Sequence, residues 1–150
     1  MERVTLDQLS TKASISPNLP EAGFLSRQQR LQRWSELLAR EPDRLLNTFP
    51  QTEYMDGQVR ASMRCANSAL TVAFEDPVLR EAGLTDDSYG TAKKFFELSD
   101  RHMHWILCYC HHGMSVRAGV LVSVLRSILP RTPQFSLFGW VKHVFIPRAL

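Results

Sequence analysis

The sequence predicts a mainly α-helical protein, folded as a compact single-domain bundle of about six or seven helices. The chain has 150 residues, which suits one domain. Hydrophobic residues make up 44% and charged residues 22%, as in globular proteins. Residues typical of helix starts and stops also frame apolar side chains at helical spacing. We expect a flexible N-terminal arm (residues 1–22), a helical domain (23–130) and an apolar C-terminal arm (131–150).

The first helix is predicted to begin at Ser26, after an arm rich in Ser, Thr and Pro. Ser26 and Gln29 have capping-box spacing, in which each side chain satisfies a free backbone N–H of the first turn. The apolar residues that follow share one helical face: Leu31, Trp34, Leu37 and Leu38. Pro42 either ends this helix or begins the next one. Residues 44–49 are predicted to form a short helix.

The middle of the chain is predicted to consist of short elements. Asp56 is a candidate cap for one helix. Residues 69–74 fit either a short helix or a strand. Asp76 followed by Pro77 is typical of a helix start, and Gly83 is a natural stop.

Two further helices follow, each with an acidic residue at its predicted start. Residues 85–87 place two aspartates at the positive end of the first helix dipole. Its apolar face would carry Tyr89, Ala92, Phe95 and Phe96. The second helix is predicted over residues 100–112, capped by Ser99 and ended by Gly113.

Residues 116–129 form the most apolar stretch of the predicted domain. Ser115 is the expected cap, and Pro130 the expected stop. A helix that is apolar on nearly every face is normally buried, so we expect this one at the centre of the core. Its valines leave a buried strand as the competing prediction.

The predicted C-terminal arm is rich in aromatic residues. Its segment 135–146 fits either a helix or a strand, and it must cover an apolar surface to remain soluble. That surface would lie on its own domain or on a second subunit. Residue types enriched in protein interfaces make up the predicted contact set: Phe135, Phe138, Trp140, Phe145 and Arg148.

Residues 101–113 hold four histidines and two cysteines, residue types that bind zinc and other transition metals. On one continuous helix the candidate ligands would form a stripe: His104, Cys108, His111 and His112. The face toward the core would carry Met103, Ile106, Leu107, Cys110 and Met114. One helix rarely gives one ion more than two ligands, so others would come from elsewhere, such as Cys65, Asp86 or Glu97. The alternative is a helix whose His and Cys side chains only pack against neighbours.

Cys108 near a histidine would also permit a thiolate–imidazole pair for nucleophilic catalysis. However, the chain lacks the Walker-type G-x4-G-K-[ST], G-x-G-x-x-G, G-x-S-x-G and HExxH motifs. The sequence therefore gives no positive indication of an enzyme.

The charge is unevenly distributed along the chain. Residues 101–150 contain six Lys or Arg and no acid, a pattern that can mark phosphate contact. Residues 98–115, a capped helix followed by a glycine turn and a serine, resemble the opening of a LuxR-type helix-turn-helix domain. The resemblance implies DNA binding, but residues 116–129 are apolar where a recognition helix presents polar side chains.

These observations predict a small non-enzymatic interaction or regulatory protein that acts as a homo-oligomer. The first alternative is a transition-metal-binding protein, with zinc as a candidate ion. The second alternative is a nucleic-acid-binding protein that uses its acid-free C-terminal third. Three cysteines are too few for a disulfide framework, and no apolar run is long enough to span a bilayer. We therefore expect a cytoplasmic protein without a transmembrane segment.

Overall fold

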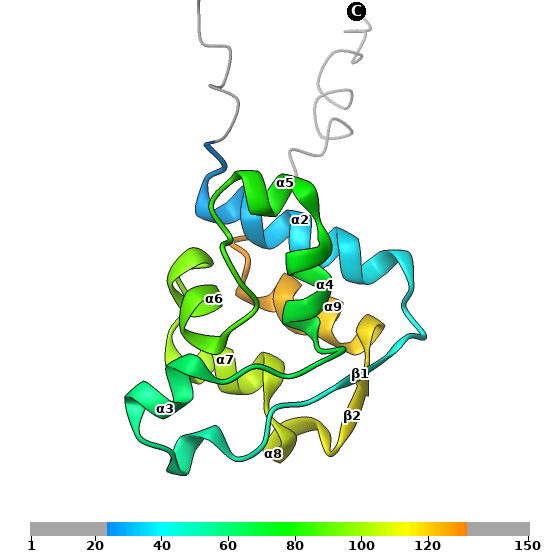
Figure 1. Cartoon of the computed structure of the whole chain (residues 1–150). Coiled ribbons are helices and arrows are strands. Elements are labelled where there is room, and N and C mark those ends of the chain that lie inside the picture. Colours follow the sequence, from blue (N-terminus) through cyan, green and yellow to red (C-terminus); the bar gives the residue numbers. More distant parts are fainter. Residues whose placement is uncertain (1–23, 132–150) are drawn as a thin grey trace, which may run out of the picture.

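The computed structural model describes residues 24–131, and this part of the chain is mainly α-helical, as predicted. It contains eight α-helices, one 3-10 turn and two short strands (Figure 1). In chain order they are α2 (Arg27–Arg40), β1 (Leu45–Asn47), η1 (Thr52–Tyr54), α3 (Gly57–Ser62), α4 (Ala69–Glu75), α5 (Pro77–Glu81), α6 (Tyr89–Phe95), α7 (Asp100–Leu107), α8 (Tyr109–His112), β2 (Ser115–Arg117) and α9 (Ala118–Ile128).

Side-chain caps start most of these helices where the sequence predicts them. Ser26 and Gln29 form the capping box of α2, and Asp56 caps α3. Residues 69–74, which fit a helix or a strand, lie in helix α4, capped by Ser68. Asp76 accepts a hydrogen bond from the Leu79 backbone at the start of α5.

The core lies where α2, α4 and α9 meet, with α6 and α7 packed alongside (Figure 1). Trp34 of α2 is fully buried, stacks on Phe96 with ring centroids 4.4 Å apart, and donates a hydrogen bond to the Ala69 carbonyl. The largest other side chains of this core include Leu31, Leu38, Phe49, Leu70, Tyr89, Met103 and Ile106. Sequence-distant helices are therefore held by one continuous apolar cluster.

The prediction of a helix over residues 44–49 is wrong, because this segment pairs with a distant part of the chain. Strand β1 runs antiparallel to β2, with Leu46 opposite Val116. Its other edge is also used, since the Asn47 N–H donates to the Asn67 carbonyl. Extended pairing satisfies the backbone groups and buries Leu46, so tertiary context overrides local helical preference.

The helix predicted over residues 116–129 is shorter than expected. Ser115 belongs to β2 instead of capping the helix, and α9 begins at Ala118 without a side-chain cap. The helix packs against α2 and α7, as expected of a central helix. However, Val120 is 49% exposed, so α9 is central without being buried on every face.

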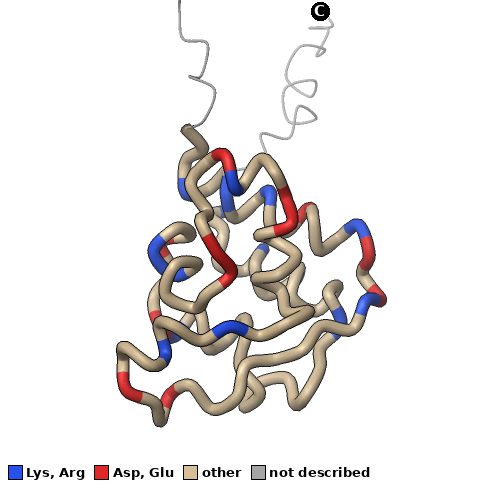
Figure 2. Tube along the Cα trace, in the orientation of Figure 1, with Lys and Arg blue, Asp and Glu red and all other residues tan. Residues whose placement is uncertain are grey.

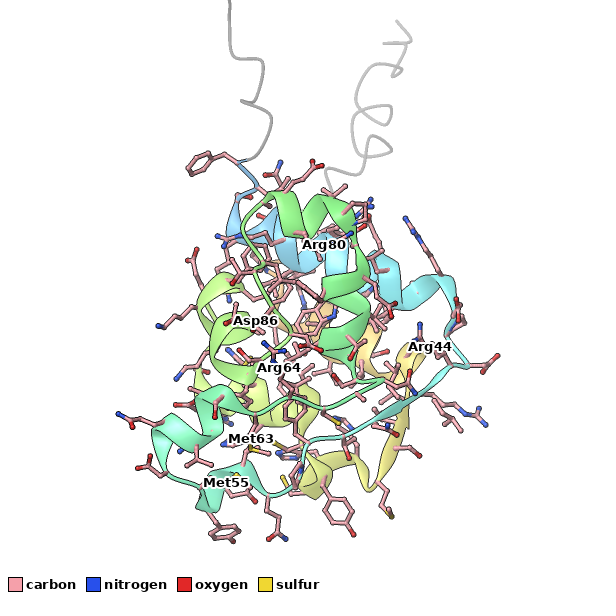
Figure 3. All side chains as sticks on the ribbon, in the orientation of Figure 1. Arg44, Met55, Met63, Arg64, Arg80 and Asp86 are labelled. Carbon is pink, nitrogen blue, oxygen red and sulfur yellow. The ribbon has the colours of Figure 1, made fainter. Side chains whose placement is uncertain are left out.

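The start of α6 also differs from the prediction. Ser88, not residues 85–87, is the capping residue, and its side chain accepts from the Thr91 backbone. Asp86 instead accepts from the Ser88 N–H and lies 3.7 Å from Arg64, an ion pair visible in Figure 3. The aspartate therefore shapes the loop before the helix.

A close approach between α3 and α6 requires Gly90. A Cβ atom at this position would lie 2.8 Å from the Ala61 Cβ and 2.9 Å from its carbonyl oxygen. We expect Gly90→Ala to lower the free energy of unfolding by about 1–3 kcal/mol through overpacking. Gly57→Ala is the matched control, because a methyl group added there would have no neighbour within 4 Å. Urea denaturation checks both, and a Gly90→Ala protein as stable as Gly57→Ala would contradict the prediction.

The predicted N-terminal arm lies outside the described residues, and so does the predicted C-terminal arm except for Arg131. The same holds for the predicted contact residues Phe135, Phe138, Trp140, Phe145 and Arg148. Within residues 24–131, no helix combines the length and apolar character needed to cross a membrane.

Candidate metal centre

The helix predicted over residues 100–112 is broken at Cys108, and this break creates the site. Helix α7 ends at Leu107, Cys108 is extended (φ −88°, ψ 146°), and α8 ends at Gly113. Phe49 lies alongside the break: its N–H donates to the Leu107 carbonyl, and its carbonyl accepts from the Tyr109 N–H, each at 2.8 Å. These bonds replace the helical ones, so a contact across the fold interrupts the helix.

The freed helical carbonyl finds another partner. In a continuous helix, the Tyr109 N–H would donate to the Trp105 carbonyl. Here His112 Nε2 lies 2.8 Å from that carbonyl oxygen and donates to it. The predicted ligand His112 therefore caps the broken end of α7.

Three side chains meet at the break. Cys108 Sγ lies 3.0 Å from His104 Nδ1, and the Thr52 hydroxyl oxygen lies 2.8 Å from His104 Nδ1 and 3.0 Å from Cys108 Sγ. Cys108 and Thr52 are fully buried, whereas His104 is partly exposed. A sulfur, an imidazole and a hydroxyl thus form a closed triangle of polar contacts.

Glu53 adds a carboxylate to this triangle. Ligand-type atoms of Glu53, His104 and Cys108 all lie within 4.8 Å of one another. Glu53 is exposed and borders solvent, while Cys108 lies on the protein side. Among residues 24–131, these three side chains are close enough together to share one metal ion, and no other group of three His, Cys, Asp or Glu side chains in this range is. We call these three residues the Glu53–His104–Cys108 cluster.

Burial favours the uncharged forms of the imidazole and the thiol. Desolvation raises the pKa of the Cys108 thiol, an effect that the hydrogen bond with Thr52 partly opposes. Desolvation also lowers the pKa of His104, against the pull of nearby Glu53. A thiolate–imidazolium pair is therefore disfavoured, and a fully buried sulfur is poorly placed to attack a substrate. A divalent cation would reverse this balance by stabilising the thiolate.

The structure divides the predicted stripe. It brings His104 and Cys108 together but leaves His111 exposed, and neither His111 nor His112 belongs to the cluster. The suggested additional ligands Cys65, Asp86 and Glu97 do not belong to it either.

Two residues predicted on the core face lie outside the core. Cys110 is exposed and Met114 is 80% exposed, because the chain changes direction at Cys108 and helical spacing no longer applies. The other three residues of that predicted face, Met103, Ile106 and Leu107, are buried as expected.

Glu53 is the ligand-type residue that sequence reasoning missed. It lies 51 positions before His104, in a 3-10 turn without a metal-binding spacing. Thr52 points inward and Glu53 outward from this turn. A short-range motif search cannot find such a pair, because the Phe49 contact with residues 107–109 brings the segments together.

A shallow, mostly apolar groove lies next to the cluster. It is lined by Pro50, Gln51, Tyr54, Met55 and Tyr109, which flank the site residues on both segments. Tyr54 is 82% exposed, and Figure 3 shows Met55 at the same end of the molecule as η1 and α3. Exposed aromatic side chains around a groove are typical of contact surfaces.

The charges of the described residues are mixed. Figure 2 shows basic and acidic residues close together over much of the described trace, but residues 101–131 carry four arginines and no acid. Of the basic residues after position 100, Arg117 lies 3.8 Å from Asp43. Nucleic-acid binding through the C-terminal third stays a prediction, since residues 132–150 lie outside the described part.

Comparison with known proteins gives no family for this chain: no protein-family model, no curated protein and no solved structure matches it.

Proposed function

We propose that this chain is a transition-metal-binding protein. Its proposed physiological ion is zinc, bound by Glu53, His104 and Cys108. One observation carries the proposal: a carboxylate, an imidazole and a thiol from two distant segments lie within 4.8 Å of one another. Cysteine sulfur, histidine nitrogen and carboxylate oxygen are the three ligand types that zinc prefers.

The spacing of these atoms suits one ion after a small adjustment. Zinc binds its ligands at about 2.0–2.3 Å, so tetrahedral ligand atoms lie about 3.3–3.7 Å apart. The exposed side chain of Glu53 is free to close the remaining distance. Cys108 Sγ and His104 Nδ1 lie 3.0 Å apart and would separate slightly to bind one ion through these atoms, while the Phe49 contacts and helix α7 position their backbones.

Thr52 supports the site as a positioning residue. Its hydroxyl is within hydrogen-bond distance of both Cys108 Sγ and His104 Nδ1. Such a partner can donate to a thiolate and orient the imidazole, and removing it typically weakens metal affinity about 10–100-fold. Three protein ligands leave a fourth position for water or another ligand.

The direct test is a metal titration of the full-length protein with Zn²⁺ and Co²⁺, since Co²⁺ reports a thiolate ligand by its absorption. We expect one ion per chain. Cys108→Ser should weaken binding by more than about 100-fold, and Glu53→Gln and Thr52→Val should weaken it about 10–100-fold. The cobalt–thiolate band should be absent from Cys108→Ser.

Matched controls exist in the same region. Cys110→Ser and His111→Gln alter an exposed cysteine and histidine outside the cluster, and both should bind zinc as the unmodified protein does. Circular dichroism checks that each variant is folded. Absence of stoichiometric binding would refute the proposal. Loss of zinc binding in His111→Gln would show that His111, and not Glu53, is a ligand, and would also contradict the proposed ligand set.

We further propose that the protein resides in a reducing compartment such as the cytoplasm. A thiolate ligand must stay reduced to bind an ion, and free thiols persist in such compartments. The described cysteines Cys65, Cys108 and Cys110 are all free.

A second candidate function is that of a homo-oligomeric interaction protein, as the sequence predicts. The groove with the exposed Tyr54 supports it, with a second copy of the chain as the occupant. Light scattering over a range of concentrations tests this candidate. We expect a dimer that Tyr54→Ser weakens, and a monomer at every concentration would refute it.

A further inference from the structure

A small pocket lies where helices α3 and α6 meet the start of α7 (Figure 1). Two of its lining residues are basic, Arg60 of α3 and Lys93 of α6, and one is acidic, Asp100 of α7. The remaining lining residues are Gly57, Ala61, Tyr89 and Gly90. We call this cavity the Arg60–Lys93 pocket. None of its lining residues belongs to the Glu53–His104–Cys108 cluster or to the groove beside that cluster.

The charged side chains of the pocket are connected through Asp100. Its carboxylate lies 2.8 Å from Lys93 Nζ and accepts a hydrogen bond from the Tyr89 hydroxyl at 3.3 Å. Arg60 Nη1 lies 3.6 Å from the same carboxylate, which is too far for a good hydrogen bond. Because two cations face one acid, the lining keeps an excess of positive charge.

The two basic side chains also retain donors for a ligand. Lys93 has an ammonium group with several N–H donors, of which one points to Asp100. Arg60 Nη2 donates to the Met55 carbonyl, but Arg60 Nε is buried and has no hydrogen-bond partner within residues 24–131. An unpartnered buried donor is uncommon in folded proteins and can mark a group that an ion or a water molecule completes. The guanidinium is therefore only partly satisfied by the protein itself.

The size and charge of the pocket restrict its ligand to a small anion. Its volume is about 120 Å³. This is slightly less than the roughly 150 Å³ of a cavity that admits benzene, so it suits a group of the size of phosphate. A guanidinium binds phosphate oxygens through paired N–H groups, and a lysine binds them as a point charge. A phosphate group has about two negative charges at neutral pH, so two cations match it better than they match a carboxylate.

We propose that the Arg60–Lys93 pocket binds a phosphate group, either as the free ion or as the end of a larger phosphorylated molecule. Arg60 and Lys93 contact its oxygens from two different helices, so the ligand also connects α3 to α6. Asp100 competes with the ligand for the same two cations and thereby limits the affinity. This proposal does not depend on the metal proposal, because the two sites share no residue.

Calorimetric titration of the full-length protein with inorganic phosphate at low ionic strength tests the proposal. Zinc is omitted, because it precipitates with phosphate. We expect saturable binding of one ion per chain. Arg60→Gln and Lys93→Gln should each weaken binding about tenfold or more, since each removes a charge-assisted contact. Lys94→Gln is the matched control: it removes the same charge from an exposed neighbour outside the pocket and should change the affinity less than about twofold.

Two further variants separate ligand binding from a purely structural role of these ion pairs. Asp100→Asn removes the competing acid and should strengthen phosphate binding, which loss of a structural ion pair would not do. Lys93→Arg keeps the positive charge and should retain binding. Circular dichroism checks that each variant is folded, and the partly exposed Lys93 provides the test if Arg60→Gln does not fold.

Several outcomes would overturn the proposal. They are the absence of saturable binding by the unmodified protein, equal losses in Lys93→Gln and Lys94→Gln, and weaker binding by a folded Asp100→Asn protein. Acetate that binds as tightly as phosphate would also overturn it, because the pocket would then select no phosphate group.

Phenyl phosphate distinguishes the two sources of the phosphate group. Binding similar to that of inorganic phosphate would assign the pocket to a phosphorylated molecule whose remainder stays in solvent. Exclusion of phenyl phosphate would assign it to the free ion. Either result agrees with the proposal, provided that inorganic phosphate itself binds.

Discussion

Replacing Trp34 with alanine is expected to lower the free energy of unfolding by about 3–5 kcal/mol, the range for removing a buried tryptophan. The indole is fully buried between α2 and α4 and stacks on Phe96. Its Nε1 donates to the Ala69 carbonyl at 2.9 Å. No smaller side chain fills this volume, so the substitution leaves a cavity at the junction of three helices.

Two further variants separate the contributions of Trp34. Trp34→Phe keeps an aromatic ring beside Phe96 but loses the donor to Ala69, so we expect a loss of only about 1–2 kcal/mol. Trp105→Ala removes the same kind of side chain at a position that is 41% exposed and should cost less than Trp34→Ala. Urea denaturation measures all three. Equal losses for Trp34→Ala and Trp105→Ala would contradict the packing described for α2 and α4.

Asp76→Ala is expected to have the second largest effect on stability, about 2–4 kcal/mol. The carboxylate is buried, accepts from the Leu79 backbone at the start of α5 and pairs with Arg33 through two hydrogen bonds of 2.8 and 3.1 Å. Removing it leaves a helix start uncapped and a guanidinium without its partner. Asp43→Ala is the matched control, since the Asp43–Arg117 pair is exposed and should cost less than about 1 kcal/mol.

Acid should selectively weaken the Asp76 contribution. The hydrogen-bonded Arg33 guanidinium is the main cause that lowers the pKa of Asp76 in the folded protein. A carboxyl with a lowered pKa stabilises the fold above its unfolded pKa of about 3.9, and this stabilisation is lost as the pH falls through the lower folded value. Asp76→Asn keeps a capping side chain without the charge. Its deficit against the unmodified protein, measured by denaturation, should therefore shrink below about pH 4. A deficit that is constant from pH 7 to pH 3 would contradict the charge pair.

The parts of the fold that the sequence predicts are those encoded by neighbouring residues. The Ser26–Gln29 capping box, the Asp76-Pro77 helix start and the buried face of α2 all depend on spacings of a few positions. Gly83 is likewise found with positive φ beyond α5.

Two mistaken helix predictions, over residues 44–49 and over residues 100–112, involve contacts between distant segments, whereas the misplaced start of α6 is a local error. Residues 45–47 become a strand because they meet residues 115–117, and the helix over 100–112 breaks because Phe49 inserts its backbone groups at Cys108. Local propensity carries no information about either contact. The sequence could identify His104 and Cys108 as a pair one turn apart, but Glu53 enters through the same long-range contact.

The segment of residues 45–52 has a consequence for folding. Its backbone is hydrogen-bonded to the later part of the chain at two places, through the β1–β2 pairing and through Phe49 at the α7–α8 break. Closing the first of these loops carries most of the entropic cost, since the second closure joins segments that are already neighbours. The Glu53–His104–Cys108 cluster therefore has no counterpart in the unfolded ensemble. Any ligand that binds there more tightly than to the unfolded chain draws the folding equilibrium toward the native state by mass action, by an amount set by its concentration and dissociation constant.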